Sequence, residues 1–274
     1  MDTVSSAGDR RARFHALHGG SALFVMPNPW DVGSARLLEA CGFAALATTS
    51  QGLAWTLGKR DMQVTRDELV AHVERLAAAI EVPLNVDSER CFPDESGRVA
   101  DTVRLLGEAG AAGFSIEDYD PAADRIDDVS LSVERVAEAA EVARSFDPPL
   151  VLTGRAENHI RGVDDLDDTI ARLVAYRDAG ADCVYAPGLA ELEQIEAVVE
   201  AVGVPVNVLA LPMGPPVPEL ERVGVRRVST GSLLASAANA ALVAGARELL
   251  DEGSSAYAEA RVPRELLDVA FRPS

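Results

Sequence analysis

Carboxylates and one arginine follow three successive short apolar segments of this sequence. Asp87 and Glu89 come directly after one segment, Glu117 comes after the next, and Arg155 lies close after the third. If the segments are neighbouring parallel strands, these side chains meet at the edge where the strands end. Converging carboxylates repel one another, and a hard cation such as Mg²⁺ or Mn²⁺, which prefers oxygen ligands, removes that repulsion. The pattern predicts a divalent metal site at Asp87, with Glu89 and Glu117 behind it.

A site of this kind also needs groups that hold an anionic substrate. Arg155 can pair with a carboxylate or a phosphonate in a forked geometry. Ser50, together with the backbone N–H groups of Gln51 and Gly52, follows the second strand candidate and can hold another substrate oxygen. Asn207, on the seventh candidate, is expected to bind the substrate as well.

His159 is the histidine nearest to the predicted site, and it is a candidate acid–base group. For each of these residues alone, an ordinary structural role stays open, because a carboxylate after a strand often caps the next helix or pairs with a surface arginine. The joint pattern across adjacent strand ends favours a functional site. The other histidines, His15, His18 and His72, are expected to face solvent.

A recurring junction indicates the elements that position these residues. Helical segments end in Ala-Gly or Gly, and an apolar run follows, as at Gly42, Gly110, Gly180 and Gly224. Glycine past a helix end adopts the left-handed conformation at little cost, and the apolar run is typical of a strand buried on both faces. With the other short apolar runs, we expect eight strands: Leu23–Met26, Ala44–Thr48, Leu84–Val86, Gly113–Ile116, Leu150–Thr153, Cys183–Tyr185, Val206–Leu209 and Arg227–Thr230.

Helical patterns separate these runs. Leu69, Val73 and Leu76 share one helical face, and Thr65 and Glu68 form a capping box before it. Eight strands that alternate with helices predict a parallel (β/α)8 barrel of the TIM type, with a doubly wound open sheet as the alternative. No glycine-rich dinucleotide fingerprint follows the first strand.

The barrel is expected to form one domain over residues 1–274. Within it we predict a leading helix over about 1–20, an alanine-rich helix over 232–250 and a helical tail over about 251–274. Additions of this kind after a barrel often form an interface between subunits.

The composition limits the class of partner. The 274 residues carry a net charge of −19, which repels the phosphates of nucleic acids. We see no apolar stretch near the roughly 18 residues of a membrane span, and the N-terminus lacks the apolar core of a signal peptide. We therefore predict a cytoplasmic protein that binds neither nucleic acid nor membrane. Cys41, Cys91 and Cys183 form no CxxC pair and are expected to be buried free thiols.

The sequence resembles the isocitrate lyase / phosphoenolpyruvate mutase superfamily over roughly Phe24 to Leu250. The order and spacing of several short motifs carry the resemblance. They are Asn28-Pro29-Trp30-Asp31, Ser34-Ala35-Arg36, Thr49-Ser50-Gln51-Gly52-Leu53-Ala54, Leu57-Gly58, Asp61, Pro83 to Glu89, Gly110 to Asp118, Thr153-Gly154-Arg155 and Ala179-Gly180-Ala181-Asp182.

The resemblance implies a barrel whose last helix is often exchanged with a partner subunit, a homodimer or homotetramer, and a bound magnesium ion. It implies small 2-oxo or 2-hydroxy acids, or phosphonates, as substrates, and an enolate intermediate. By this match Asp87 would be the direct metal ligand, and Asp61, Glu89 and Glu117 would contact the ion through water. Ser50, Gly52 and Arg155 would bind the anionic groups of the substrate.

Some positions depart from the pattern of that superfamily. The lyase branch carries a Lys-Lys-Cys-Gly-His loop after the fourth strand, whereas residues 119–125 contain no cysteine, lysine or histidine. Pro187 stands where many members have an acidic residue, and Glu89 replaces the usual second aspartate. We therefore predict a divergent magnesium-dependent lyase or decarboxylase that acts on a small oxo or hydroxy acid. A P–C bond enzyme and a barrel that retains only metabolite binding are the alternatives.

Overall fold

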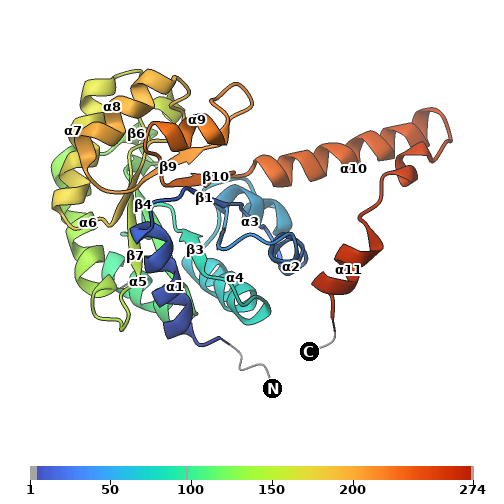
Figure 1. The fold of residues 1–274 in the computed structure, drawn as a ribbon, viewed down its shortest axis with the longest axis horizontal. Coiled ribbons are helices and arrows are strands. Elements are labelled where there is room, and N and C mark those ends of the chain that lie inside the picture. The colour runs from blue at the N-terminus through green and yellow to red at the C-terminus, as the bar shows by residue number, and fades with distance from the viewer. Residues whose placement is uncertain (1–4, 97, 273–274) are drawn as a thin grey trace.

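Eight parallel strands form a nearly closed barrel in the computed structural model of the chain, which describes residues 5–96 and 98–272 (Figure 1). The order around the sheet is β1-β10-β9-β8-β7-β4-β3-β2. The strands are β1 (Phe24–Met26), β2 (Leu46–Ala47), β3 (Leu84–Asp87), β4 (Gly113–Glu117), β7 (Val151–Arg155), β8 (Cys183–Tyr185), β9 (Val206–Leu209) and β10 (Arg227–Ser229). Each of the eight predicted strands is confirmed, and the barrel replaces the open-sheet alternative.

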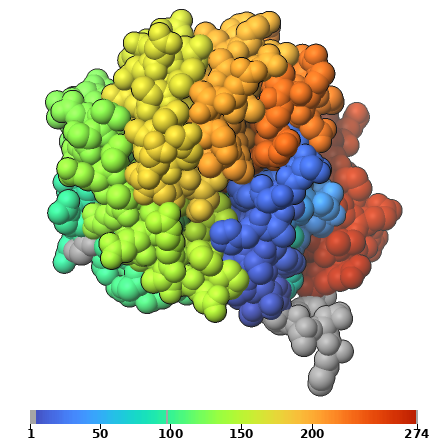
Figure 2. Space-filling model, turned by 60° about the vertical axis from the view of Figure 1, so that its left-hand side comes forward, coloured from blue at the N-terminus to red at the C-terminus, as the bar shows by residue number. Residues whose placement is uncertain are grey.

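Helices alternate with the strands on the outside of the barrel. They are α1 (Ala7–Gly19), α2 (Val32–Ala40), α3 (Ser50–Thr56), α4 (Arg66–Ala79), α5 (Arg98–Glu108), α6 (Val129–Ala143), α7 (Leu166–Asp178), α8 (Leu192–Val202), α9 (Val217–Arg222), α10 (Leu233–Asp251) and α11 (Arg264–Ala270). Two short 3₁₀ turns, η1 (His159–Arg161) and η2 (Ala256–Glu259), complete them. Figure 2 shows the outer helices α6, α7 and α8 side by side around the barrel.

Local sequence explains where several helices begin and end. The predicted capping box is present at α4, where the Thr65 hydroxyl accepts from the Glu68 N–H and the Glu68 carboxylate accepts from the Thr65 N–H. Gly180, after α7, has φ +114°, and a Cβ there would lie 2.9 Å from the Cβ of Ala140. The turn from α7 into β8 therefore needs glycine for both its conformation and its space.

The first and second strands approach each other where the barrel closes. The Ala47 N–H donates to the Pro27 carbonyl at 3.0 Å, and the Asn28 side-chain amide donates to the Thr48 carbonyl at 2.6 Å. The helix α1 packs at the barrel through Phe14, which belongs to an apolar cluster with β1 and β2 residues. A larger cluster lies between the strands and the outer helices.

The C-terminal region leaves the barrel. Figure 1 shows α10 projecting away from it, while α11 returns and packs against α2. The predicted helix over 232–250 is confirmed as α10, and the predicted tail is helical at η2 and α11, while its residues 273–274 lie outside the described residues. The exchange of this region between subunits is not shown and stays a prediction. Within residues 5–96 and 98–272, α10 is also the one helix long and apolar enough to cross a membrane, so the expectation that no apolar stretch comes near that length was wrong.

Two expectations about burial were wrong. His18 and His72 are buried, 9% and 4% exposed, rather than facing solvent. His18 lies within the Phe14 cluster and meets the Phe24 ring edge-on, and His72 lies on the core-facing side of α4. Cys91 and Cys183 are buried free thiols as expected, whereas Cys41 is exposed because it caps the end of α2.

Candidate active site

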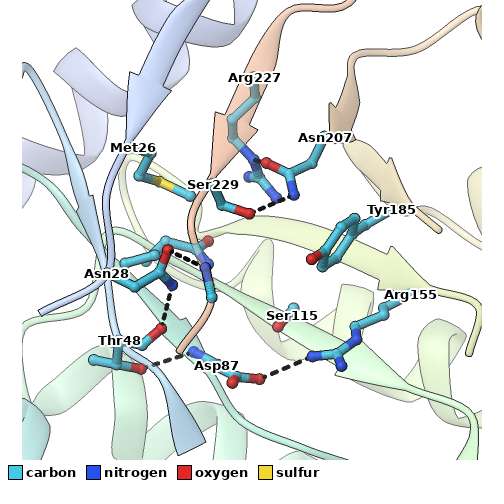
Figure 3. A pocket seen from close by; sticks show the side chains of 13 residues that line it. Met26, Asn28, Thr48, Asp87, Ser115, Arg155, Tyr185, Asn207, Arg227 and Ser229 are labelled. Atoms are coloured by element: carbon cyan, nitrogen blue, oxygen red, sulfur yellow. Dashed lines mark hydrogen bonds and ion pairs between the residues drawn. The ribbon is translucent and has the colours of Figure 1, made fainter. Parts of the chain in front are cut away.

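Arg155, at the end of β7, lies among three carboxylates at the C-terminal ends of the strands. Its guanidinium reaches Asp87 at 3.3 Å, Glu117 at 3.1 Å and Glu157 at 2.5 Å. Figure 3 shows the Asp87 and Arg155 side chains pointing toward each other and joined as an ion pair. Parallel pairing of β3, β4 and β7 puts these strand ends side by side, which is the convergence that the sequence pattern predicts.

The start of α3 joins the same group through Ser50. The Ser50 N–H donates to Asp87 at 2.9 Å, and the Ser50 hydroxyl donates to Asp61 at 3.2 Å. A further bond, from the Asp87 N–H to the Thr48 hydroxyl at 2.9 Å, fixes the end of β3. The predicted residues Ser50, Asp61, Asp87 and Arg155 therefore meet in one place.

The crowding of carboxylates changes their acidity. Burial raises the pKa of Glu89 to about 8, with Asp87 and Asp61 adding to the effect. Burial and the neighbouring Asp87 also raise the pKa of Asp61. The pKa of Glu117 is raised well above its ordinary value by burial, although Arg155 opposes the shift. A site that strains the ionised form of so many carboxylates is suited to a positive ion.

The loop after β3 has an unusual backbone. Glu89, Cys91 and Phe92 have φ of 50°, 57° and 48°, in the left-handed region that side chains other than glycine rarely adopt. The Glu117 N–H donates to the Glu89 carbonyl at 3.0 Å, so the loop is tied to β4. Backbone strain of this kind is common near functional sites, where the surrounding structure holds it.

The residues present fit a divalent cation held mainly through water. One oxygen of Glu117, Oε1, is buried and has no hydrogen-bond partner among the described residues. Over residues 5–96 and 98–272, no three His, Cys, Asp or Glu side chains lie close enough together to ligate an ion directly. Magnesium usually keeps several waters and binds through one or two carboxylates, so one direct ligand with others behind water is compatible with both observations.

Two cavities adjoin at this end of the barrel and share Asp87, Arg155, Tyr185 and Gly231. The larger, about 240 Å³, is also lined by Ser50, Gln51 and Asp61 and is large enough for a molecule of a few carbon atoms. The smaller, about 40 Å³, extends into the barrel and is lined by polar groups that include Asn28, Thr48, Asn85, Asn207, Arg227 and Ser229 (Figure 3).

Several predicted site residues do not line the larger cavity. His159 is packed against Gly188 beside Asp164, and it does not line the larger cavity. The Gly52 N–H donates to the Thr49 hydroxyl at 3.3 Å, and Gly52 lies outside the lining of both cavities. Asn207 lines the smaller cavity and not the larger one. Glu89 lines neither cavity but lies in the loop behind Asp87.

Other residues of the site were not predicted. Glu157 is fully buried and joins Arg155 to Arg161, whose Nε lies 3.0 Å from the second Glu157 oxygen. Arg161 lines the larger cavity, and its guanidinium carbon lies 3.5 Å from the centre of the Tyr119 ring. Tyr185, at the end of β8, also lines the cavity. Tyr185 lies at the end of the sixth barrel strand, so the expectation that functional residues lie at the strand ends also applies to it.

An antiparallel hairpin of β5 (Tyr119–Asp120) and β6 (Arg125–Ile126) follows β4. It occupies the place in the sequence where the lyase branch has its cysteine-bearing loop. Asp118, before it, pairs with Arg172 at 3.2 Å and accepts from the Tyr176 hydroxyl at 2.6 Å, so it is held by other side chains of the fold. The hairpin reaches the site through Tyr119, whose ring stacks with Arg161, and it supplies no acidic thiol.

Known proteins that are similar to this chain in sequence and fold include enzymes. The sequence profile of the phosphoenolpyruvate phosphomutase family matches residues 14–250. A Burkholderia cenocepacia structure described as a lyase or mutase is 47% identical, with a TM-score of 0.91, over 96% of this chain and 95% of that one. An oxaloacetate decarboxylase of Rhodopseudomonas palustris is 28% identical over 96% of this chain and 89% of its own.

Oxaloacetate acetylhydrolase, solved with its product oxalate, has a TM-score of 0.83 and is 25% identical over 96% of this chain and 94% of that one. The profile match covers most of the barrel and α10 and includes each of the strand ends that meet at Arg155. The chain is therefore an enzyme of the phosphoenolpyruvate phosphomutase family, within the PEP mutase/isocitrate lyase superfamily of carbon–carbon lyases and mutases.

Proposed function

We propose that the chain is a magnesium- or manganese-dependent lyase or decarboxylase that acts on a small 2-oxo or 2-hydroxy carboxylic acid. One observation carries the proposal: Asp87, Asp61, Ser50 and Arg155 meet at a cavity of about 240 Å³ at the C-terminal end of the barrel. A cavity of this size suits a substrate of a few carbon atoms. The decarboxylase and the acetylhydrolase among the relatives both take oxaloacetate by name, which supports the same class of substrate here.

Each residue would have a role that follows from its position. Arg155 would bind a substrate carboxylate, because its fork geometry matches two carboxylate oxygens. Ser50 and Gln51 also line the cavity and would orient the substrate oxygens. Asp87 would hold the metal directly, with Asp61, Glu89 and Glu117 contacting it through water. When bound, such an ion stabilises negative charge that develops on a substrate oxygen.

The hairpin β5–β6 bears on the choice among substrates. Its residues 119–126 contain no cysteine, histidine or lysine, so the acid that the lyase branch uses is missing. This supports a small oxo acid rather than isocitrate or methylisocitrate. The alternative of a P–C bond enzyme rests on the family profile, and a third alternative is a barrel that binds a metabolite without turnover.

A turnover screen tests the proposal. The purified protein would be offered oxaloacetate, substituted malates, methylisocitrate and phosphonopyruvate with Mg²⁺, and 2-oxo acid products and phosphate would be measured. We expect turnover of one carboxylate substrate that is lost on adding a chelator. Release of phosphate from phosphonopyruvate would favour the P–C alternative, and tight Mg²⁺ and oxalate binding without turnover would favour the metabolite-binding alternative.

We also propose that the protein is a homodimer or homotetramer assembled through α10. This helix projects from the barrel with Leu242 and Leu250 exposed by 71% and 84%. Exposed leucines on a projecting helix are typical of an interface rather than of a solvated surface. Light scattering coupled to size-exclusion chromatography would measure the mass of the assembly, and a monomer at micromolar concentration would refute the proposal. The location in the cytoplasm stays a prediction.

A further inference from the structure

Tyr185 stands at the boundary between the two cavities. It ends β8, its side chain is 9% exposed, and it lines both the larger and the smaller cavity. Figure 3 shows its ring between Arg155 on one side and Asn207 and Ser229 on the other, with the hydroxyl directed into the cavity. The guanidinium carbon of Arg155 lies 5.4 Å from the centre of the ring. A substrate carboxylate held by Arg155 would therefore lie close to this hydroxyl.

The other proton-bearing groups around the larger cavity are engaged or unsuited. The Ser50 hydroxyl directs its proton to Asp61, and Arg161 stacks on Tyr119 while it pairs with Glu157. A serine hydroxyl such as that of Ser232 is a much weaker acid than a phenol. His159, the acid–base candidate from the sequence, lies outside the lining. Asp61 also lines the cavity and has a raised pKa, but it accepts from Ser50 and is assigned to the proposed metal. Burial raises the pKa of Tyr185 to about 12, so the phenol carries its proton at neutral pH. Among the described lining residues, Tyr185 is the neutral acid that remains.

The smaller cavity offers a route by which Tyr185 can regain a proton. Its volume of about 40 Å³ holds one or two water molecules, and its lining supplies the polar partners that they need. Asn85 Oδ1 is buried there without a hydrogen-bond partner in the described part of the chain, so it can accept from such a water. The Asn207 amide donates to the Ser229 hydroxyl at 2.9 Å, which continues the polar lining behind Tyr185.

We propose that Tyr185 is the catalytic acid that protonates the enolate carbon of the product. This inference rests on the proposed function, because it takes a 2-oxo acid enolate as the species formed. When the C–C bond of the substrate breaks, its electron pair enters the enolate. The enolate carbon then takes the proton of the Tyr185 hydroxyl, a C–H bond forms, and the enolate oxygen becomes the carbonyl of the 2-oxo acid. The tyrosinate lies beside the Arg155 cation until water in the smaller cavity returns the proton.

The ketonisation of enolpyruvate isolates this step from C–C cleavage. Enolpyruvate would be generated in the assay from phosphoenolpyruvate with excess acid phosphatase, and its conversion to pyruvate would be followed by the decay of its ultraviolet absorbance. The proteins compared are the unmodified chain, Tyr185→Phe, and Tyr257→Phe as a control that changes an exposed tyrosine of the C-terminal region. Mg²⁺-dependent oxalate binding would be measured for all three by calorimetry.

We expect the unmodified chain and Tyr257→Phe to accelerate ketonisation at least tenfold over buffer with Mg²⁺. Tyr185→Phe should fall at least tenfold from that rate while its oxalate affinity stays within twofold. Ketonisation by Tyr185→Phe at the unmodified rate would overturn the assignment, and so would an unmodified chain no faster than buffer. Loss of oxalate binding in Tyr185→Phe would show a role in binding instead. The carboxylate turnover screen tests the proposed function separately, since it measures cleavage and not proton transfer to a supplied enol.

Discussion

Replacement of His72 by leucine should make the protein less sensitive to acid. His72 lies on the core-facing side of α4 and is 4% exposed, and its Nε2 has no hydrogen-bond partner within the described residues. Burial lowers the pKa of His72 from 6.5 to about 4, with Arg75 adding to the shift and Asp31 opposing it. The folded state therefore disfavours the protonated ring, whereas the unfolded chain accepts the proton readily.

The size of the effect follows from the two pKa values. Because the folded pKa lies below the unfolded one, the unfolded state binds more protons between them, and stability falls as the pH drops from 6.5 towards 4. At pH 5 nearly all unfolded chains carry the proton on His72, and only about a tenth of folded chains do. The resulting loss between pH 8 and pH 5 is about 2 kcal/mol of the free energy of unfolding.

Urea unfolding at pH 8 and pH 5 would measure this loss in the unmodified chain and in His72→Leu. Buried carboxylates with raised pKa values, such as Glu89, change stability with pH in the opposite direction, but they are present in both proteins and cancel in the comparison. The measurement at pH 8 removes any effect of the new side chain on packing. If both proteins lose the same free energy between the two pH values, the assignment of a buried neutral histidine is wrong.

Three further substitutions test the site and its frame. Asp87→Asn should abolish Mg²⁺ binding by calorimetry and leave the melting temperature nearly unchanged; an unchanged metal affinity would refute the assigned ligand. Arg155→Lys should weaken oxalate binding by about tenfold to a hundredfold, since a point charge replaces a fork that makes two charged hydrogen bonds, and an equal affinity would remove Arg155 from the anion site. Gly113→Ala should destabilise the fold by about 1–3 kcal/mol, because the added Cβ would lie 2.6 Å from the Val151 carbonyl oxygen. A melting temperature equal to that of the unmodified protein would contradict this packing.

The barrel could be predicted because its signals are local and repeated. A glycine after each of several helices and an apolar run behind it mark the strands, and parallel pairing then brings the strand ends together. The convergence of Asp87, Glu117 and Arg155 followed from that reasoning without knowledge of any distance. The same reasoning at the end of the sixth strand would have included Tyr185.

The buried histidine of α4 also had a signal that we did not use. Position 72 lies three residues after Leu69 and four before Leu76, on the face already expected to be buried. The polarity of histidine favours a solvent-facing side chain, whereas its position on this face favours burial. The periodicity was the better guide, because the whole face packs against the core and the ring stays neutral there.

Other features had no signal in the sequence. The strands β5 and β6 are two residues long and lack an alternating pattern, so the hairpin could not be told from a loop. The left-handed conformations of Glu89, Cys91 and Phe92 occur at residue types that do not favour them. Glu157 pairs with Arg155 and Arg161, which are close to it in the chain, but its complete burial depends on the assembled barrel, where its N–H donates to Asp118 on the neighbouring strand end.

The anchoring of the hairpin β5–β6 is consistent with a catalytic acid that lies at the end of β8 and not on a mobile loop. Arg90 joins Asp120 of the hairpin at 3.0 Å and Asp127 behind it at 3.1 Å, and Arg135 pairs with Asp127 as well. Moving the hairpin would break ion pairs that are largely buried, which typically costs about 3–5 kcal/mol when one partner is left unpaired. A loop that carries a catalytic acid must close for each turnover, and that need conflicts with such anchoring. An acid at the end of a strand needs no loop closure. A proton donor on β8 is therefore compatible with an anchored hairpin, whereas a catalytic acid carried by the hairpin would not be.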